Sequence, residues 1–298
     1  MITYHTPVLL EQTIEGLALQ SNGWYVDATF GGGGHAQAIL DQLGPYGQLV
    51  GFDKDEAAAA NEPNDERFQL VNHDYAYLYH FVRYLGLSPL NGILADLGVA
   101  SHHLETAERG FTYRADGPLD MRMDQRSPTT AAHIVNTYPA DELRRILGQY
   151  GEVKNARQVA QTIVSARQQE RLTTTGQLTA LLRQTIHGQD KLARYQSQVF
   201  QALRIEVNEE LSSLKAFLQA AVSLLKPEGR LAVVTYHSLE DRLVKHFFRA
   251  GNFTGKPVKD IYGREQAPLE PVTRKPVLPS EAEITDNPRA RSAKLRIA

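Results

Sequence analysis

The sequence predicts an α/β protein in which a doubly wound, mostly parallel sheet is interrupted by a mostly helical insertion. A glycine-rich turn near the N-terminus lies between an apolar strand pattern and an apolar helix pattern. Further short apolar runs follow, and several end at a polar residue, as strands of a buried parallel sheet do. Between residues 127 and 187 the pattern changes to apolar stripes with helical spacing, after which the strand pattern resumes.

The N-terminal turn has the form of a nucleotide-binding corner. Residues 24–26 (WYV) are predicted to form a short buried strand, four glycines occupy residues 31–34, and residues 36–43 have apolar helical spacing that stops at Gly44. A strand, a glycine turn and a helix form the ligand-binding corner of doubly wound sheets. Glycine is needed there because the backbone turns sharply and lets a ligand come close.

The glycines alone do not identify the ligand. The spacing Gly31-x-Gly33-x-x-Ala36 fits the dinucleotide pattern G-x-G-x-x-G/A. Residues 27–33 (DATFGGG) also resemble the D-x-G-x-G-x-G loop of S-adenosylmethionine enzymes, with Thr29 at the first glycine position. A surface turn without a ligand is the third interpretation, and the strand before the turn and the acidic residue after it argue against it.

That acidic residue is Asp53, which ends a second predicted strand at residues 49–52 and lies 22 residues after Gly31. A carboxylate at this place can accept hydrogen bonds from both ribose hydroxyls of a nucleotide. No arginine stands beside it to favour a 2′-phosphate. The alternative is an ordinary solvated aspartate in the acidic turn at residues 53–56.

The remaining elements follow in chain order. Strands are predicted at residues 68–71, 92–95, 230–236 and 293–298, and helices between residues 127 and 187, at residues 209–225 and after residue 237. Ser127-Pro128 fits an N-cap followed by proline at the first helical position, and Ser238 is expected to cap the helix after residue 237, close to a capping box with Asp241. Residues 226–229 (KPEG) are predicted to form a turn.

This order of elements predicts two domains. Residues 1–104 and 201–298 form the α/β domain, and residues 105–200 form an inserted, mostly helical domain for substrate recognition. Within the insertion, residues 105–125 are predicted to form a lid in which Arg109 and Arg122 are available to bond phosphate or to stack on a base. The alternative is a self-paired surface loop with two buried methionines.

Composition excludes several classes of protein. The chain has no cysteine, which excludes disulfides, thiolate metal sites and cysteine nucleophiles. It has no apolar run of membrane-span length and no signal-peptide pattern, so we expect a cytoplasmic protein without membrane contact. The zinc-deaminase pattern is absent as well, and no metal is expected.

The net charge of −2 conceals an asymmetry along the chain. Residues 1–104 contain 12 acidic and 3 basic side chains, whereas residues 105–298 contain 22 acidic and 29 basic ones. Residues 141–194, in the helical insertion, contain 9 basic and 5 acidic side chains. This distribution suggests a polyanionic partner on one side of the protein. A globally balanced surface is the alternative, because the chain has no dense run of lysine and arginine.

Ordered segments along nearly the whole chain resemble the bacterial 16S rRNA cytosine-N4 methyltransferase family. They are residues 5–10 (HTPVLL), 27–35 (DATFGGGGH), 96–99 (DLGV), 108–111 (ERGF), 116–123 (DGPLDMRM), 200–205 (FQALRI), 237–242 (HSLEDR) and 287–292 (NPRARS). Any one segment is a weak signal, but the ordered set is specific.

The resemblance implies a Rossmann-like class I S-adenosylmethionine-dependent methyltransferase sheet. It implies S-adenosyl-L-methionine as methyl donor, S-adenosylhomocysteine as product, and methylation of a cytosine N4 in the decoding centre (the P-site region) of 16S rRNA in the small ribosomal subunit. Carried over residue by residue, the cofactor contacts are Gly33, Gly34 and His35 to the methionine part, Asp53 to the ribose, Tyr75 beside the adenine, and Asp96 at the end of its strand.

Three residues are candidates for work at the cytosine. Asp96 is the first candidate near the reacting amine, although binding of the cofactor alone is an equally good interpretation. Tyr236 and His237 follow a predicted strand and could stack on the base or hydrogen-bond to it. Their alternative role is simple packing at a strand end.

Two segments depart from the family pattern. Residues 100–105 (ASHHLE) stand where the family usually has Ser-Ser-x-Gln-Leu-Asp, so the cofactor contact expected of the glutamine falls on His103. Residues 194–198 (RYQSQ) replace a His-Pro-Ala-x-Arg run. The alternatives are therefore a diverged paralogue that methylates another RNA, a non-catalytic ribosome-assembly factor, and an NAD-dependent oxidoreductase. A DNA enzyme is disfavoured because an Asn/Asp-Pro-Pro-Tyr motif is absent. Monomer and weak homodimer both stay open.

Overall fold

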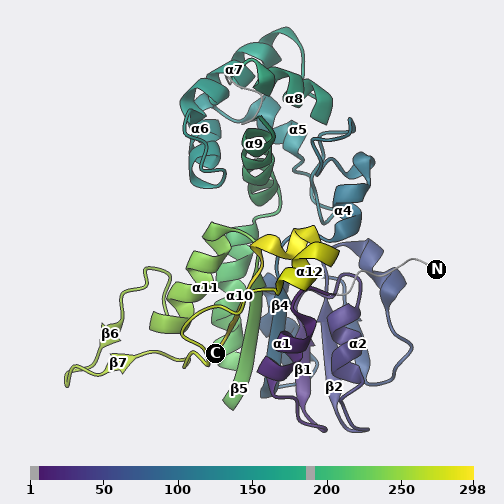
Figure 1. The fold of residues 1–298 in the computed structure, drawn as a ribbon, viewed down its shortest axis with the longest axis vertical. Helices are drawn as coiled ribbons and strands as arrows, with labels where there is room; N and C mark the ends of the chain where they lie inside the picture. Colours follow the sequence, from purple (N-terminus) through teal and green to yellow (C-terminus); the bar gives the residue numbers. More distant parts are fainter. Residues whose placement is uncertain (1–6, 186–191) are drawn as a thin grey trace. The chain divides into compact units, whose positions relative to one another are not determined.

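The computed structural model describes residues 7–185 and 192–298, and the chain divides into two compact units (Figure 1). The α/β unit comprises Met1–Gly98 and Leu211–Ala298, and the helical unit comprises Val99–Glu210. The domain boundary expected between residues 200 and 201 falls inside helix α9, which is why the helical unit continues to Glu210. His5 and Thr6 of the first matching segment lie outside the described residues.

The α/β unit is built on a six-stranded sheet with the order β3-β2-β1-β4-β5-β8. The strands are β1 (Trp24–Asp27), β2 (Gln48–Phe52), β3 (Phe68–Val71), β4 (Leu90–Asp96), β5 (Leu225–Thr235) and β8 (Lys294–Ile297). Neighbouring strands are parallel except β5 and β8. The chain winds outward from the centre in both directions, which confirms the predicted doubly wound α/β fold.

Helices cover both faces of this sheet, as its apolar strands require. They are α1 (Leu10–Leu17), α2 (Gly34–Leu40), α3 (Leu78–Tyr84), α10 (Glu210–Leu224) and α11 (Ser238–Ala250). Tyr25 and Leu94 belong to a buried cluster with residues of α1 and α2, whereas Val26 and Ile93 belong to a second cluster with residues of α3, α10 and α11. Successive residues of a strand point to opposite faces, so the two clusters lie on the two sides of the sheet.

The carboxyl ends of the parallel strands meet at one edge of the sheet. Asp27 ends β1, Asp96 ends β4, and Asp53 follows β2 directly. The register aligns Asp27 with Gly51 of β2 and Asp96 with Val234 of β5. Ligands of open α/β sheets bind at this edge, and the sequence-predicted aspartates therefore share it.

The predicted turn at residues 226–229 is an irregularity within β5. Leu90 pairs with Leu225, and Gly92 pairs with Arg230, so β5 contains extra residues between the two pairs. Glu228 has a positive φ of 65°, which lets the chain bend and return to the ladder. The strand therefore begins earlier than its apolar run.

The cap of α11 also differs from the prediction. His237 is the N-cap, and Glu240 three residues later accepts its backbone N–H at 3.3 Å. Ser238 is already the first helical residue. The capping box therefore starts one residue earlier than the Ser238–Asp241 pair suggested, because Glu240 is buried and reaches back to the strand end.

The helical unit contains one main apolar core. Its helices are α4 (Ser101–Glu105), α5 (Ala131–Thr137), α6 (Ala140–Gln149), α7 (Ala156–Gln169), α8 (Thr175–Arg183) and α9 (Leu192–Val207). Ser127-Pro128 does not start a helix, because α5 begins at Ala131 with Thr130 as its cap. The N–H groups of Ala131 and Ala132 donate to carbonyls of the preceding loop, which delays the start of the helix.

The predicted lid is packed into this core. Phe111, Leu119, Met121 and Met123 are buried in the helical cluster. The guanidinium of Arg122 donates to the carboxylate of Asp120 and to the backbone carbonyls of Gln125 and Ser127, and that of Arg109 donates to the carbonyls of Arg122 and Met123. The segment therefore bonds largely within the helical unit, as in the self-paired alternative that the sequence left open, and the lid stays a prediction.

The remaining segments are short. They are the 3-10 helices η1 (Glu56–Asn61), η2 (Tyr75–Tyr77), η3 (Ala107–Arg109) and η5 (Pro288–Ser292), helix α12 (Glu281–Asp286), and strands β6 (Val258–Lys259) and β7 (Glu265–Gln266). Within the described ranges, no helix combines the length and the apolar character needed to cross a membrane.

Candidate functional site

The glycine turn is held by the carboxylate that follows β2. Gly31 and Gly33 have φ angles of 49° and 78°, a conformation that glycine adopts without strain. The N–H of Gly31 donates to Oδ2 of Asp53 at 2.8 Å, and the side chain of Asn61 donates to the carbonyl of Gly31 at 2.9 Å. The glycine turn and the acidic residue were predicted separately from the sequence. The hydrogen bond from Gly31 to Asp53 joins them in one site.

Asp53 is not the ordinary solvated aspartate of the alternative interpretation. Its Oδ1 accepts the N–H of Asp55 at 2.8 Å while its Oδ2 accepts that of Gly31. Burial raises the pKa of Asp53, and these two N–H donors oppose the rise. Because a carboxylate offers about four acceptor sites, Asp53 can still accept further bonds from a ligand.

Asp96 is connected to three neighbours at the same edge. Its backbone N–H donates to the hydroxyl of Thr29 at 2.6 Å, which gives a reason for threonine at the first glycine position of the loop pattern. The phenol of Tyr236 donates to its Oδ1 at 2.8 Å. The Nδ1 atom of His35 lies 3.8 Å from its Oδ2.

Two carboxyl groups at this edge have strongly raised pKa values. Burial raises the pKa of Asp96 to about 7; the hydrogen bond from Tyr236 opposes the rise, and the negative charges of Asp27 and Glu240 add to it. Burial likewise raises the pKa of Asp27 to about 7, and this side chain is only 1% exposed. Perturbed carboxyl groups in a ligand-binding edge are functional candidates.

His35 and Tyr236, two titratable side chains that contact Asp96, are neutral at physiological pH. Burial lowers the pKa of His35 to about 4, so the contact with Asp96 joins a neutral imidazole to the carboxyl group. Burial and the charge of Asp96 raise the pKa of Tyr236 well above its usual range, which keeps the phenol protonated as a donor. Asp96 is therefore the group that changes charge near neutral pH in this trio.

Tyr236 and His237 border a small pocket at the end of β5. The pocket has a volume of about 280 Å³ and is lined by Tyr236, His237, Ser238, Ser292 and Lys294. The carboxylate of Glu240 accepts the backbone N–H groups of Tyr236 and His237 and lies 3.0 Å from Nε2 of His237. This arrangement fixes the end of the strand that borders the pocket.

Tyr75 begins η2, after β3. Its ring lies 5.3 Å from the ring of Phe217 of α10 in an edge-to-face arrangement. The preceding residue, Asp74, forms an ion pair with Lys54 at 3.0 Å and accepts a hydrogen bond from Ser213. Tyr75 thus has a packed position on the face of the sheet covered by α3, α10 and α11.

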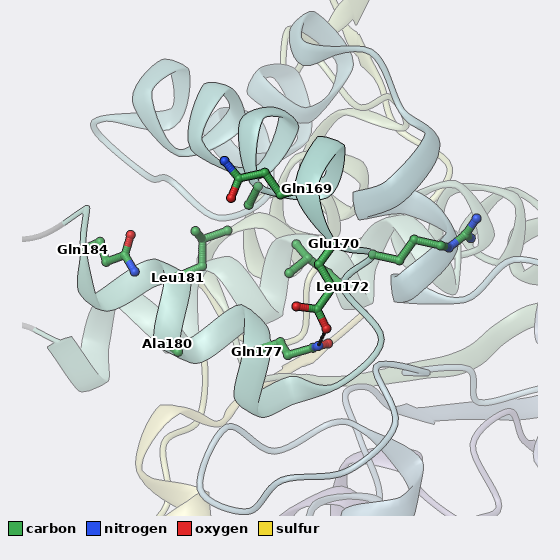
Figure 2. Close-up of a pocket in the computed structure, with 9 residues that line it drawn as sticks. Gln169, Glu170, Leu172, Gln177, Ala180, Leu181 and Gln184 are labelled. Carbon is green, nitrogen blue, oxygen red and sulfur yellow. Dashed lines mark hydrogen bonds between the residues drawn. The ribbon is translucent and has the colours of Figure 1, made fainter.

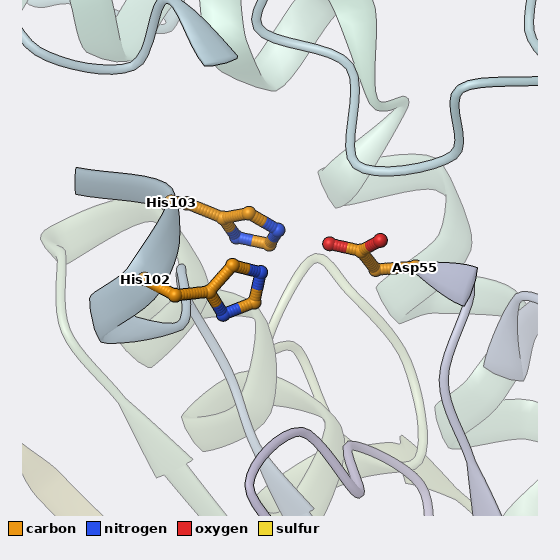
Figure 3. Close-up of side chains that lie close together, drawn as sticks. All are labelled: Asp55, His102 and His103. Atoms are coloured by element: carbon orange, nitrogen blue, oxygen red, sulfur yellow. The ribbon is translucent and has the colours of Figure 1, made fainter. Parts of the chain in front are cut away.

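Three predicted site residues, His103, Arg109 and Arg122, belong to the helical unit. His102 and His103 lie side by side on α4, with ring centroids 4.1 Å apart (Figure 3). His103 is buried, and its ring stacks on Phe111 with a centroid distance of 4.8 Å. Its ring therefore contacts His102 of the same helix and Phe111 of the loop that packs into the helical core.

The helical unit has a second pocket, of about 420 Å³, between α7 and α8 (Figure 2). Leu172 and Leu181 line it together with amide side chains, and Gln177 donates to Glu170 across it at 3.2 Å. Its lining contains none of the residues predicted for cofactor or substrate. This pocket is therefore not part of the candidate site.

Three further residues of the site were not singled out as site residues by the sequence. Asp27 and Thr29 were used only as positions of the glycine-loop pattern. Their place at the end of a predicted strand could have indicated that they belong to the site. Glu240 was hidden because Ser238 looked like the better helix cap. Its burial could not be read from the sequence.

Comparison with known proteins decides the family. A model of the MraW methylase family matches residues 2–298. The chain belongs to the MraW methylase family. This membership confirms the resemblance seen in the ordered segments and assigns methyltransferase activity to the chain.

Relatives in this family match the chain from end to end. Ribosomal RNA small subunit methyltransferase H of Bacteroides fragilis (strain YCH46) is 49% identical over 296 residues, 99% of this chain and 97% of that protein. The protein of the same name from Flavobacterium johnsoniae is 48% identical and covers 99% of this chain and 97% of its own length. Among solved structures, an rRNA methylase from Streptococcus thermophilus aligns with 100% of this chain and 97% of its own, at 12% identity and a TM-score of 0.42.

Proposed function

We propose that the protein transfers the methyl group of S-adenosyl-L-methionine to the exocyclic N4 amine of a cytosine in the decoding centre of 16S rRNA. One observation carries the proposal: Asp96, with a pKa raised to about 7, ends β4 beside the glycine turn in a chain of the MraW methylase family. Relatives named ribosomal RNA small subunit methyltransferase H support RNA of the small ribosomal subunit as the substrate.

The residues of the glycine turn fit this cofactor. The left-handed backbone at Gly31 and Gly33 leaves room for close approach of a ligand. Within the described residues, Oδ2 of Asp27 and Nε2 of His35 are buried without a hydrogen-bond partner. Buried polar atoms without a partner cost free energy, so a ligand that supplies partners is favoured at this place.

The cofactor contacts of the proposal follow the predicted residues. Gly33, Gly34 and His35 would contact the methionine part, and Asp53 would hold the ribose hydroxyls. Tyr75 would lie beside the adenine. His103, from the helical unit, is proposed as a further contact, and S-adenosylhomocysteine would leave from the same residues as product. No metal is part of the proposal.

Asp96 is the proposed proton acceptor. S-adenosylmethionine supplies a methyl group already activated by its sulfonium. The N4 lone pair of cytosine is delocalised into the ring, so the amine needs an acceptor for its N–H as the new bond forms. The carboxylate of Asp96 would accept this hydrogen bond and then the proton, and Tyr236 would hold the carboxylate in place through its bond to Oδ1.

The pocket at the end of β5 is the proposed place for the target nucleotide. Tyr236 and His237 would contact the cytosine, and the hydroxyl and ammonium groups of Ser292 and Lys294 suit its sugar and phosphate. Arg109 and Arg122 are retained only as residues that shape their loop, because their guanidinium groups bond within it. The base must leave its stack to enter, which costs least in a single-stranded loop.

A methyl-transfer assay tests the proposal. Labelled S-adenosylmethionine is offered with small ribosomal subunits, naked 16S rRNA and DNA from cells that lack this protein, and the nucleosides of the product are identified. N4-methylcytidine in 16S rRNA is the expected result. A different methylated RNA would favour the diverged paralogue, and subunit binding with bound cofactor but no transfer would favour the assembly factor.

Tyr236→Phe is expected to move the pH dependence of methyl transfer to higher pH. The bond from Tyr236 lowers the pKa of Asp96, so its loss leaves the carboxyl protonated over a wider range. Hydrogen bonds to charged groups contribute roughly 1.5–3 kcal/mol, which corresponds to a shift of about one pH unit or more. Single-turnover rates between pH 6 and 9 measure it. An equal loss at every pH would contradict the role of Tyr236 in lowering the pKa of Asp96 and would leave only its proposed contact with the cytosine.

Arg157→Gln is expected to reduce the salt dependence of subunit binding. Arg157 is exposed on α7 in the basic part of the helical unit. Loss of one phosphate contact lowers the slope of log K against log salt by about 0.7–0.9. Gln161→Ala, an exposed and uncharged change on the same helix, is the control. Arg167 is unsuited to this test, because its guanidinium bonds the carbonyls of Val135 and Tyr138. An unchanged slope in Arg157→Gln would exclude this contact.

A further inference from the structure

A hairpin that takes no part in the main sheet projects from the α/β unit. Strands β6 and β7 pair only with each other, as an antiparallel two-stranded sheet. Figure 1 shows this hairpin extending away from α11 and from the main sheet. We call residues 256–266 the arm. The proposed transfer chemistry does not use it.

The tip of the arm is an ordered turn. The N–H of Asp260 donates to the carbonyl of Arg264 at 2.9 Å, and Gly263 takes a φ of 79°. Oδ1 of Asp260 accepts the N–H groups of Tyr262 and Arg264 at 2.8 and 2.9 Å. The carboxylate of Asp260 is therefore occupied in shaping the turn, with its charge partly satisfied by backbone donors.

The base of the arm is fixed as well. Phe253 stacks on Phe247 of α11 with a centroid distance of 5.1 Å. The side chain of Asn252 donates to the carbonyls of Ala250 and Lys256 and accepts the N–H of Gly255. These contacts hold the start of the arm against the end of α11.

This fixed arm presents apolar side chains to solvent. Ile261 is 91% exposed, Tyr262 is 79% exposed and Val258 is 57% exposed. Single exposed apolar residues are ordinary, but three on one short hairpin form a surface that a partner could cover. The ordered turn places Ile261 and Tyr262 at its outermost point, so they are available to a partner without rearrangement.

The charges of the arm favour a polyanionic partner. Its basic residues are Lys256, Lys259 and Arg264, and its acidic residues are Asp260 and Glu265. The carboxylate of Asp260 accepts backbone N–H groups of the turn. The guanidinium of Arg264 lies 6.0 Å from the ring centroid of Tyr262. An exposed aromatic ring with cations beside it is the chemistry that binds unpaired nucleotides, because the ring stacks on a base and the cations bond phosphates.

We propose that the arm is an RNA-binding element in which Tyr262 stacks on an unpaired base while Arg264 and Lys259 contact neighbouring phosphates. The inference rests on the proposed function in taking small-subunit rRNA as the partner. It adds a contact surface separate from the transfer site, and it concerns affinity for the RNA rather than the chemical step.

Tyr262→Ala is expected to weaken binding of the full-length protein to small subunits and to naked 16S rRNA roughly 5- to 100-fold, the usual range for loss of one base stack. Tyr262→Phe keeps the ring and is expected to bind like the wild type. Tyr46→Ala is the matched control, because Tyr46 is 76% exposed and lies outside the arm, shortly before β2. Arg264→Gln is expected to lower the salt slope by about 0.7–0.9.

Equal affinities of Tyr262→Ala and the wild type for both RNA substrates would overturn the proposal. A loss seen with intact subunits but not with naked rRNA would overturn it too, and would point to a protein surface on the subunit. Binding of S-adenosylhomocysteine, and methyl transfer at saturating subunit concentration, are expected to be unchanged. Failure of the proposed function would appear instead as absent transfer in the wild type, with the affinity comparison still readable.

Discussion

Asp96→Asn is expected to lower the rate constant of methyl transfer by roughly 10²- to 10⁴-fold, the range typical of a lost general base. Asparagine has nearly the same shape and can still accept the bond from Tyr236, but it cannot take a proton from the amine. Affinity for S-adenosylhomocysteine should stay close to the wild-type value. Single-turnover transfer to small subunits and calorimetry with S-adenosylhomocysteine measure the two quantities.

Asp27→Asn is the matched control for this prediction. Asp27 is also a buried carboxyl group at a strand end with a pKa raised to about 7, and its charge raises the pKa of Asp96. Its removal should therefore lower the pKa of Asp96 and increase the rate below pH 7 relative to the rate above it. If Asp96→Asn instead loses cofactor affinity and transfer in equal measure, Asp96 only binds the cofactor.

The pH dependence has a definite sign in both activity and stability. The ionised form of Asp96 is the acceptor, so transfer should rise with pH through about 7 and then level off. The folded protein holds protons on Asp27 and Asp96 up to about pH 7, whereas the unfolded chain releases them near pH 3.8. The free energy of unfolding should therefore fall between these values as pH rises, and either asparagine variant should reduce that fall.

The sequence was sufficient for the parts of the fold that depend on local pattern. Apolar runs located β1, β2, β3, β4 and β8, and the polar residues that end them, Asp53 and Asp96, needed only their positions along the chain. The bond between Tyr236 and Asp96 could not be foreseen, because it depends on the register of β4 against β5. Neither could the burial of Asp27, which sets its pKa.

Charged loops were the harder case. The segment that contains Asp120 and Arg122 mixes arginine and aspartate. This sequence pattern fits both a lid over RNA and a loop that bonds to itself. Packing favours the loop that bonds to itself, since Met121 and Met123 are buried in the helical core and fix the loop around them. Helix caps failed for a similar reason: Thr130 and His237 cap their helices because tertiary contacts select them over nearby serines.

Asp53→Ala is expected to weaken binding of S-adenosylhomocysteine by roughly 100-fold or more, because hydrogen bonds to a charged group contribute about 1.5–3 kcal/mol each. Two bonds to ribose hydroxyls would be lost in the proposed complex. Calorimetry measures the affinity, and thermal unfolding checks the fold. Asp41→Ala is the control, since Asp41 is an exposed aspartate at the end of α2 whose side chain accepts a hydrogen bond from Gln37 of the same helix.

The expected loss of cofactor affinity in Asp53→Ala has a second cause, the loss of order in the glycine turn, and a second variant can separate the two causes. Oδ2 of Asp53 accepts the N–H of Gly31, so its removal also frees the turn that approaches the cofactor. Asn61→Ala removes the other side-chain bond to Gly31 without touching the ribose site. If the order of the turn dominates, Asn61→Ala should weaken binding nearly as much as Asp53→Ala. If the ribose bonds dominate, Asn61→Ala should have a small effect, and an adenine or methionine fragment without ribose should bind Asp53→Ala and the wild type alike.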